Sequence, residues 1–334
     1  MPEDGKRGAR RTRGRQGSPP VAALDLGTNN CRLLVARATR RGGLRVLDSF
    51  SRIVRLGEGL AQSGQLSPAA IDRTIAALKI CAGRLRANKV ERVRAVATEA
   101  ARRAANAQVL VARARDEAGI VLEIITTDEE ARLAALGCAP LIDPRLEGGL
   151  IFDIGGGSTE IIWMRREAKA DARVVAFTSE PLGVVTLAES WNSGALDRGG
   201  YARMRDEIVG FLAPVKAKLE DRARFDAAAH HLLGTSGTVT TLAAIALGLS
   251  RYERTRVDAS WHRCADIEQV IDSLVDMTLE QRAAVGCIGP DRADLIVPGC
   301  AIFAAIRVLW PCERLRVADR GLREGMLREL VAAP

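Results

Sequence analysis

Two short glycine-rich segments each follow an aspartate that ends an apolar run. The first reads Asp25-Leu26-Gly27-Thr28-Asn29-Asn30, and the second reads Asp153-Ile154-Gly155-Gly156-Gly157-Ser158-Thr159-Glu160. Glycine allows backbone N–H groups to approach an anion where a Cβ would obstruct them. Aspartate offers a hard oxygen ligand for a divalent cation or for its bound water. The pair of turns therefore predicts a phosphate and metal site, whereas either turn alone is equally well explained as a tight β-hairpin.

A third segment combines glycine with small hydroxyl residues. Gly234-Thr235-Ser236-Gly237-Thr238 follows a short apolar strand and opens a helix. Backbone N–H groups at a helix start can hold a phosphate or a nucleotide. The alternative is an ordinary threonine-capped helix start, which is the better explanation of this segment taken alone.

One acidic residue stands at an expected helix start. The spacing of Thr127 and Glu130 predicts a capping box, in which a glutamate at the third helical position bonds back to the cap. From the residues alone, Glu130 is therefore expected to cap the helix rather than to do chemistry.

The elements around these turns suggest two copies of one design. Val21–Leu26 and Arg32–Ala36 are expected to form one hairpin, and Leu150–Ile154 with Thr159–Met164 repeats it. Pro68 predicts the start of a helix, and residues 99–118 are expected to form another. We expect a basic disordered tail at 1–19, a first α/β domain at 20–139 and a second at 140–334, with the last helix able to return to the first domain. Two such halves facing each other would leave a ligand cleft between them.

Composition and charge limit the class of protein. The chain has 334 residues, 47% of them hydrophobic and 4% aromatic, with a net charge of +8. Six basic residues against two acidic ones fall in the first 19, so the folded part is only mildly basic and suits a polyanion without being diagnostic of one. No apolar stretch is long enough to span a membrane, and seven scattered cysteines without a C-x-x-C pair fit reduced core thiols in a cytoplasmic protein. The chain has only three histidines, so it offers few ligands for a zinc site.

Taken together, the three segments resemble the two phosphate motifs and the adenosine motif of the actin–hexokinase–Hsp70 superfamily. More closely, they are similar to the exopolyphosphatase/guanosine pentaphosphate phosphohydrolase (Ppx/GppA) family. Supporting runs are Ala95–Glu99, Glu129–Arg132, Asp291–Asp294 and Gly321–Gly325, and the resemblance extends from about Val21 to Leu330. It implies an α/β fold of two actin-like (ribonuclease H-like) domains with a central interdomain cleft, in a short form without the C-terminal HD-type domain.

The resemblance also implies roles for particular residues. Glu130, the second glutamate of its run, becomes the expected catalytic base, and Arg102 matches an arginine that contacts phosphate, with a surface helix arginine as the equal alternative. Asp153 is expected to act in catalysis and, with Glu160 and Asp25, to hold Mg²⁺ or Mn²⁺. The first turn carries Thr28-Asn29-Asn30 where the family often has Ser-Asn-Ser, which removes one hydroxyl donor. The expected phosphate-binding residues are Gly27, Thr28, Asn29, Asn30, Arg102, Gly155, Gly156, Gly157, Ser158 and Thr159, and the expected nucleotide or polyphosphate turn is Gly234, Thr235, Ser236, Gly237 and Thr238.

The function that follows is a Mg²⁺-dependent phosphohydrolase that releases terminal phosphate from inorganic polyphosphate, guanosine pentaphosphate or both. An actin-fold kinase and a non-catalytic nucleotide-binding regulator remain as alternatives. The resemblance implies a homodimer, and neither a membrane nor a nucleic acid is expected as a partner.

Overall fold

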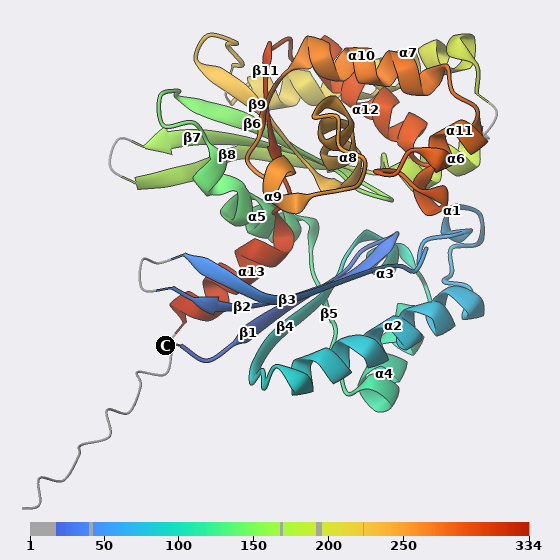
Figure 1. Cartoon of the computed structure of the whole chain (residues 1–334), viewed down its shortest axis with the longest axis vertical. Coiled ribbons are helices and arrows are strands. Elements are labelled where there is room, and N and C mark those ends of the chain that lie inside the picture. Colours follow the sequence, from blue (N-terminus) through green and yellow to red (C-terminus); the bar gives the residue numbers. More distant parts are fainter. Residues whose placement is uncertain (1–17, 40–42, 168–169, 192–195, 223, 334) are drawn as a thin grey trace, which may run out of the picture.

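The chain forms two lobes, each built on one mixed β-sheet (Figure 1). The computed structural model describes residues 18–39, 43–167, 170–191, 196–222 and 224–333. The basic tail expected at 1–19 therefore lies outside the described residues up to position 17.

The first sheet has five strands in the order β3-β2-β1-β4-β5. Its strands are β1 (Val21–Leu26), β2 (Asn30–Ala38), β3 (Leu44–Ile53), β4 (Arg92–Ala97) and β5 (Glu123–Ile124). The first three form an antiparallel meander, while β4 and β5 run parallel to β1. The strand β1 is central and buried except at the half-buried Asp25, which matches its apolar sequence on either side of that residue.

The second sheet repeats this arrangement and adds one strand. Its order is β10-β11-β9-β6-β7-β8. The strands are β6 (Gly148–Ile154), β7 (Thr159–Glu167), β8 (Ala170–Glu180), β9 (His230–Thr235), β10 (Trp261–Arg263) and β11 (Arg314–Ala318). The strands β6 to β8 form an antiparallel meander, and β9 and β11 run parallel to β6. The predicted α/β fold with two copies of one design is confirmed.

Helices cover the outer face of each sheet. The first sheet carries α2 (Pro68–Ala87), α3 (Glu99–Arg103) and α4 (Ala107–Ala118) over an aliphatic core. The second carries α6 (Val184–Trp191), α7 (Arg198–Glu220), α8 (Ser236–Ala246), α10 (Cys264–Val275) and α12 (Ile296–Leu309). There are also short helices, namely α1 (Leu60–Ser63), α9 (Arg254–Val257) and α11 (Leu279–Ala284). The helix α2 begins as predicted, with Pro68 at its first position and the Ser67 hydroxyl accepting from Ala70 N–H.

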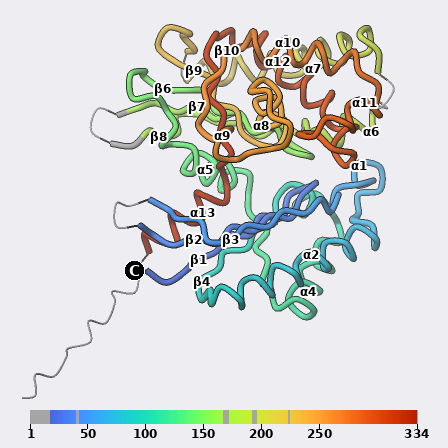
Figure 2. The backbone as a smooth tube through the Cα atoms, viewed as in Figure 1, coloured from blue at the N-terminus to red at the C-terminus, as the bar shows by residue number. Residues whose placement is uncertain are grey.

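Two helices fill the space between the sheets and cross over between the lobes (Figure 2). The helix α5 (Thr127–Cys138) packs on the second sheet, whereas the C-terminal α13 (Leu322–Ala332) packs on the first. They touch through glycines: a Cβ on Gly137 would lie 2.0 Å from the Gly321 carbonyl oxygen, and one on Gly325 would lie 2.0 Å from that of Leu133. The division of the chain at residue 140 stays a prediction.

Two local predictions were wrong, and one strand was not predicted. Residues 99–118 form two helices rather than one, because Asn106 between them exchanges two hydrogen bonds with the backbone of Leu66, at 2.8 and 2.9 Å. The strand β3, which mixes polar and apolar residues, was not expected, although it pairs with β2 with one register shift between Val35 and Ala36. The capping box of Thr127 and Glu130 does not form, since Thr126 caps α5 by accepting from Glu129 N–H.

All seven cysteines lie in the described part of the chain, buried and without disulfides, as core thiols were expected to be. Across the described ranges, no helix combines the length and the apolar character needed to cross a membrane.

Candidate active site

The two glycine turns close in the same way, one in each lobe. In the first, Gly27 N–H donates to the Asn30 carbonyl oxygen at 2.9 Å, and in the second, Gly155 N–H donates to that of Ser158 at 2.9 Å. Each turn joins the first two strands of its meander, β1 to β2 and β6 to β7. The repeated sequence pattern thus produces a repeated backbone geometry.

These turns face each other at contact distance. A Cβ added to Gly156 would lie 3.1 Å from the Thr28 Cβ, and one added to Gly157 would lie 2.9 Å from the Thr28 Oγ1. These separations are shorter than ordinary van der Waals contacts, so a side chain at either glycine would force the Thr28 side chain or the turn to shift. The expected face-to-face arrangement is present.

Between the turns lies a cavity of about 130 Å³. This volume exceeds the ~10–15 Å³ that one water needs, so it can hold a phosphoryl group or a hydrated ion. Among the residues that line it are Asp25, Gly27, Thr28, Asn29, Asn30, Glu130, Asp153, Gly155, Gly156, Gly157, Ser158, Glu160, Ser236, Gly237 and Thr238. Residues from both lobes and from α5 are therefore brought to one place.

The turns carry polar groups without partners in the described chain. No described acceptor takes the backbone N–H groups of Thr28, Asn29, Gly156 or Gly157. The side-chain oxygens of Asn29 and Asn30 are buried without a hydrogen-bond partner among the described residues. Unpaired buried polar groups are costly, so a ligand that satisfies them would gain binding energy. The donors suit an anion, and the amide oxygens suit a cation or its water.

The carboxylates of Asp25, Asp153 and Glu160 line the cavity. In strand register Asp25 lies opposite Arg32, whereas the equivalent Asp153 lies opposite Glu160. Burial, and then the Glu160 carboxylate, raise the pKa of Asp153 to about 7. Burial also raises the pKa of Asp25 and of Glu160, although the Ser158 and Ser179 hydroxyls, both 2.7 Å from the Glu160 Oε1, counteract part of the effect on Glu160. A cluster of acids with raised pKa values, of which Glu160 is buried and both aspartates are half-buried, fits a site that a cation would neutralise.

The acids do not form a complete metal cage by themselves. Within the described ranges, no group of three His, Cys, Asp or Glu side chains is arranged to hold a metal ion. This arrangement fits Mg²⁺, which binds through one or two carboxylates and keeps several waters and substrate oxygens as its other ligands. Asp153, Glu160 and Asp25 are the residues that could hold it.

Glu130 lies in the first turn of α5 and is paired with Arg102 of α3. The Arg102 Nη1 donates to the Glu130 Oε2 at 2.6 Å and to the Ile125 carbonyl at 3.0 Å, and its Nη2 donates to the Glu99 Oε2 at 3.0 Å. Burial, and then the Glu160 carboxylate, raise the pKa of Glu130 well above its usual value, although Arg102 acts to lower it. Because Thr126 caps the helix, Glu130 is left to face the cavity.

The third turn lies beside the second. Ser236 has a φ of 80° and donates from its hydroxyl to the Ile154 carbonyl at 2.6 Å, which ties the start of α8 to the end of β6. A left-handed conformation at a residue other than glycine is strained and is found preferentially at functional sites. Thr235 does not cap the helix, because its hydroxyl donates to the Arg320 carbonyl at 2.9 Å.

Four expected site residues lie outside the cavity lining. The Thr159 hydroxyl is buried and donates to the Leu182 carbonyl at 2.6 Å. Gly234 lies beneath the third turn, where a Cβ would come within 2.6 Å of Val239. Thr235 lines a neighbouring cavity, and Arg102 holds carboxylates as described. Their assigned roles stay predictions.

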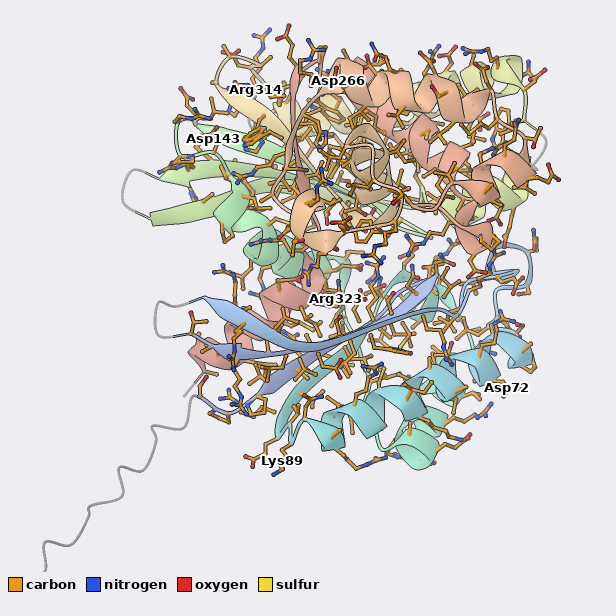
Figure 3. All side chains as sticks on the ribbon, in the orientation of Figure 1. Asp72, Lys89, Asp143, Asp266, Arg314 and Arg323 are labelled. Atoms are coloured by element: carbon orange, nitrogen blue, oxygen red, sulfur yellow. The ribbon has the colours of Figure 1, made fainter. Side chains whose placement is uncertain are left out.

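Four charged residues near the site were not assigned a role from the sequence. Arg32, Glu99 and Arg292 line the cavity, and Arg323 lies at the junction of the two lobes (Figure 3). The hairpin register could have revealed Arg32, since it stands opposite Asp25. Glu99, Arg292 and Arg323 all fall within runs that support the family resemblance.

Comparison with known proteins places this site in a family. The profile of the Ppx/GppA phosphatase family matches residues 34–333. The chain is 34% identical over 327 residues to exopolyphosphatase 2 of Mycobacterium tuberculosis, covering 93% of this chain and 98% of that protein. It is 29% identical over 329 residues to the guanosine-5'-triphosphate,3'-diphosphate pyrophosphatase of Photobacterium profundum, covering 94% of this chain and 60% of that protein.

A solved structure agrees with these matches. The crystal structure of the Aquifex aeolicus member of the Ppx/GppA family superposes with a TM-score of 0.76 at 31% identity, covering 93% of this chain and 97% of that one. Relatives of this family are phosphatases by name, and the similarity spans both lobes. The chain belongs to the Ppx/GppA phosphatase family.

Proposed function

We propose that this protein is a Mg²⁺-dependent phosphohydrolase that releases the terminal phosphate of inorganic polyphosphate. The observation that carries the proposal is the meeting of two glycine turns beside a cavity that Glu130 and Asp153 line. Unused N–H groups supply donors for the phosphoryl oxygens, and a carboxylate stands ready to accept a proton.

The chain's own groups divide the work. The N–H groups of the two turns orient the terminal phosphoryl group, with the hydroxyl of Ser158 and the side chains of the first turn around it. Arg102 engages the Oε2 of Glu130, which leaves the Oε1 to accept a proton from the attacking water. A pKa raised by burial brings this carboxylate closer to the pH at which a general base works best.

Asp153, Glu160 and Asp25 would hold the metal ion, Mg²⁺ or Mn²⁺. When bound, the ion neutralises negative charge that spreads over the phosphoryl oxygens. The carboxylates that line the cavity support this assignment, because they repel one another without a cation.

Guanosine pentaphosphate is a second candidate substrate. A neighbouring cavity of about 530 Å³ shares Asp25, Arg32 and Asp153 with the first and is also lined by Phe50 and Tyr252. Aromatic side chains beside arginines could receive a purine base. The relative from Photobacterium profundum is named a guanosine-5'-triphosphate,3'-diphosphate pyrophosphatase.

The experiment is phosphate release with no added acceptor, from chain-length-defined polyphosphate, guanosine pentaphosphate and ATP, with and without Mg²⁺. Release that depends on Mg²⁺ and is fastest with polyphosphate supports the proposal. Transfer only to an added sugar or carboxylate would indicate an actin-fold kinase, and no turnover of any substrate would indicate a nucleotide-binding regulator. The homodimer implied by the resemblance stays a prediction.

A further inference from the structure

A groove outside the catalytic cavity gathers arginines that the proposed reaction does not use. Its volume is about 600 Å³, and Ser51, Arg52, Ile53, Val54, Arg55, Glu58, Arg73, Asp291 and Arg292 line it. Four arginines thus face two carboxylates, which leaves the groove positive. Arg292 also lines the catalytic cavity, so the two spaces meet at this residue.

The groove is tied to the first glycine turn by backbone bonds. The Asn29 carbonyl accepts from the N–H groups of Val54 and Arg55, at 2.8 and 3.0 Å. Next to them, Gly57 N–H donates to the Thr28 carbonyl at 2.9 Å. The wall of the groove and the loop expected to hold the terminal phosphate therefore form one unit.

Arg55 is held in a strained conformation at the centre of this wall. Its φ is 46°, which is left-handed and uncommon for a residue other than glycine. Its guanidinium reaches the opposite lobe, 3.3 Å from the Asp294 carboxylate and 3.3 Å from the Asp291 carbonyl. In this conformation the charged Arg55 side chain spans from the first lobe to the second.

Two other arginines support or extend the same wall. Arg73 of α2 donates to the carbonyls of Val54 and Arg55, at 2.9 and 3.3 Å, and pairs with Glu58. Arg52 is exposed, and among the described residues it has no ion pair, only the Phe50 ring 5.7 Å from its guanidinium. Arg52 thus presents a charge that the described protein leaves uncompensated.

Building on the proposed function, we propose that this groove is an outer subsite for linear polyphosphate, in which Arg52 and Arg55 bind the phosphates that lie beyond the one being released. Arg52 lines the groove but not the catalytic cavity, so on this proposal long chains gain more from it than tripolyphosphate does. A linear polyanion fits better than a nucleoside, because the groove offers several guanidinium groups and no aromatic side chain in its lining.

The test compares chain lengths within each variant. The measured quantity is the ratio of kcat/KM on long-chain polyphosphate to kcat/KM on tripolyphosphate. It should fall about tenfold in the single variant Arg52→Glu and in the double variant Arg52→Gln/Arg55→Gln. Arg52→Lys, which keeps the charge, should restore most of the ratio. The matched control is Arg86→Gln, an exposed arginine of α2 away from the groove, which should leave the ratio unchanged.

An equal ratio in Arg52→Glu and in the wild type would overturn the subsite. If the wild-type protein releases no phosphate from either chain length, the proposed function fails on its own account. The subsite is then decided by calorimetric titration with long-chain polyphosphate, where binding weakened by Arg52→Glu but not by Arg86→Gln supports it, and equal binding by all three proteins rejects it.

Discussion

The guanidinium of Arg102 lies 2.6 Å from the carboxylate of Glu130, and both side chains are largely buried. The pair joins α3 of the first lobe to the start of α5, and the same arginine also holds Glu99. Arg102 therefore orients Glu130 toward the cavity and favours its charged form, whereas burial and Glu160 disfavour that form. The state of the proposed base is set by this balance.

Replacement of Arg102 should move the pH profile. Since Arg102 acts to lower the pKa of Glu130, Arg102→Gln raises that pKa further, and Glu130 stays protonated up to a higher pH. The acid limb of kcat/KM for phosphate release should shift to higher pH, and kcat should fall about 10- to 100-fold from lost positioning. The control is Arg103→Gln. The Arg103 side chain is more exposed than that of Arg102, and its contact with Glu99 is long, at 3.9 Å. If the acid limb in Arg102→Gln did not move, the protonation state of Glu130 would not be what sets that limb.

A methyl group between the turns should cost activity. In Gly157→Ala the new Cβ would meet the Thr28 Oγ1 at 2.9 Å and the Glu99 Cγ at 3.2 Å, so these side chains or the turn itself must shift. We expect kcat/KM to fall about 10- to 100-fold with little change in thermal stability. The control is Gly83→Ala in α2, where a Cβ meets nothing within 4 Å, and this variant should be fully active. Normal kinetics in Gly157→Ala would show that the contact between the turns is dispensable.

Local patterns predicted the two glycine turns and their strands better than they predicted the helices around them. The pattern of an apolar strand, an aspartate and a glycine turn involves only a few adjacent residues. Both turns and their strands could therefore be predicted from the sequence. The break between α3 and α4 depends on Asn106 bonding to Leu66, 40 positions away, and no local pattern shows it. With threonine at both 126 and 127, the spacing did not identify which one caps α5. The crossing of α5 and α13 is likewise a contact between distant segments.

That crossing should be sensitive to a single carbon. In Gly325→Ala the Cβ would lie 2.0 Å from the Leu133 carbonyl oxygen, which forces α5 and α13 apart. We expect the free energy of unfolding to fall by about 1–3 kcal/mol, as for other overpacked sites. Chemical denaturation measures it, with Gly210→Ala in α7, where a Cβ meets nothing within 4 Å, as the comparison. Equal stability of the two variants would mean that the helices separate at no cost.

Loss of the Asp153 carboxylate should weaken metal dependence. Asp153→Asn keeps the size of the side chain but removes a charged oxygen from the proposed cation site. The Mg²⁺ concentration for half-maximal activity should rise by about 10- to 100-fold or more. Asp143→Asn, at a carboxylate paired with Arg145 outside the cavity lining, serves as the control. An unchanged Mg²⁺ requirement in Asp153→Asn would place the metal elsewhere.

The central claim is that Glu130 takes the proton from water as the terminal phosphate leaves. The most direct measurement is steady-state phosphate release from polyphosphate by Glu130→Gln, beside Glu129→Gln, whose carboxylate instead pairs with Arg94 and Arg132. The account predicts that Glu130→Gln lowers kcat by about 10²- to 10⁴-fold while KM changes little, and that Glu129→Gln keeps a near-normal kcat. Near-normal release by a folded Glu130→Gln protein would contradict it.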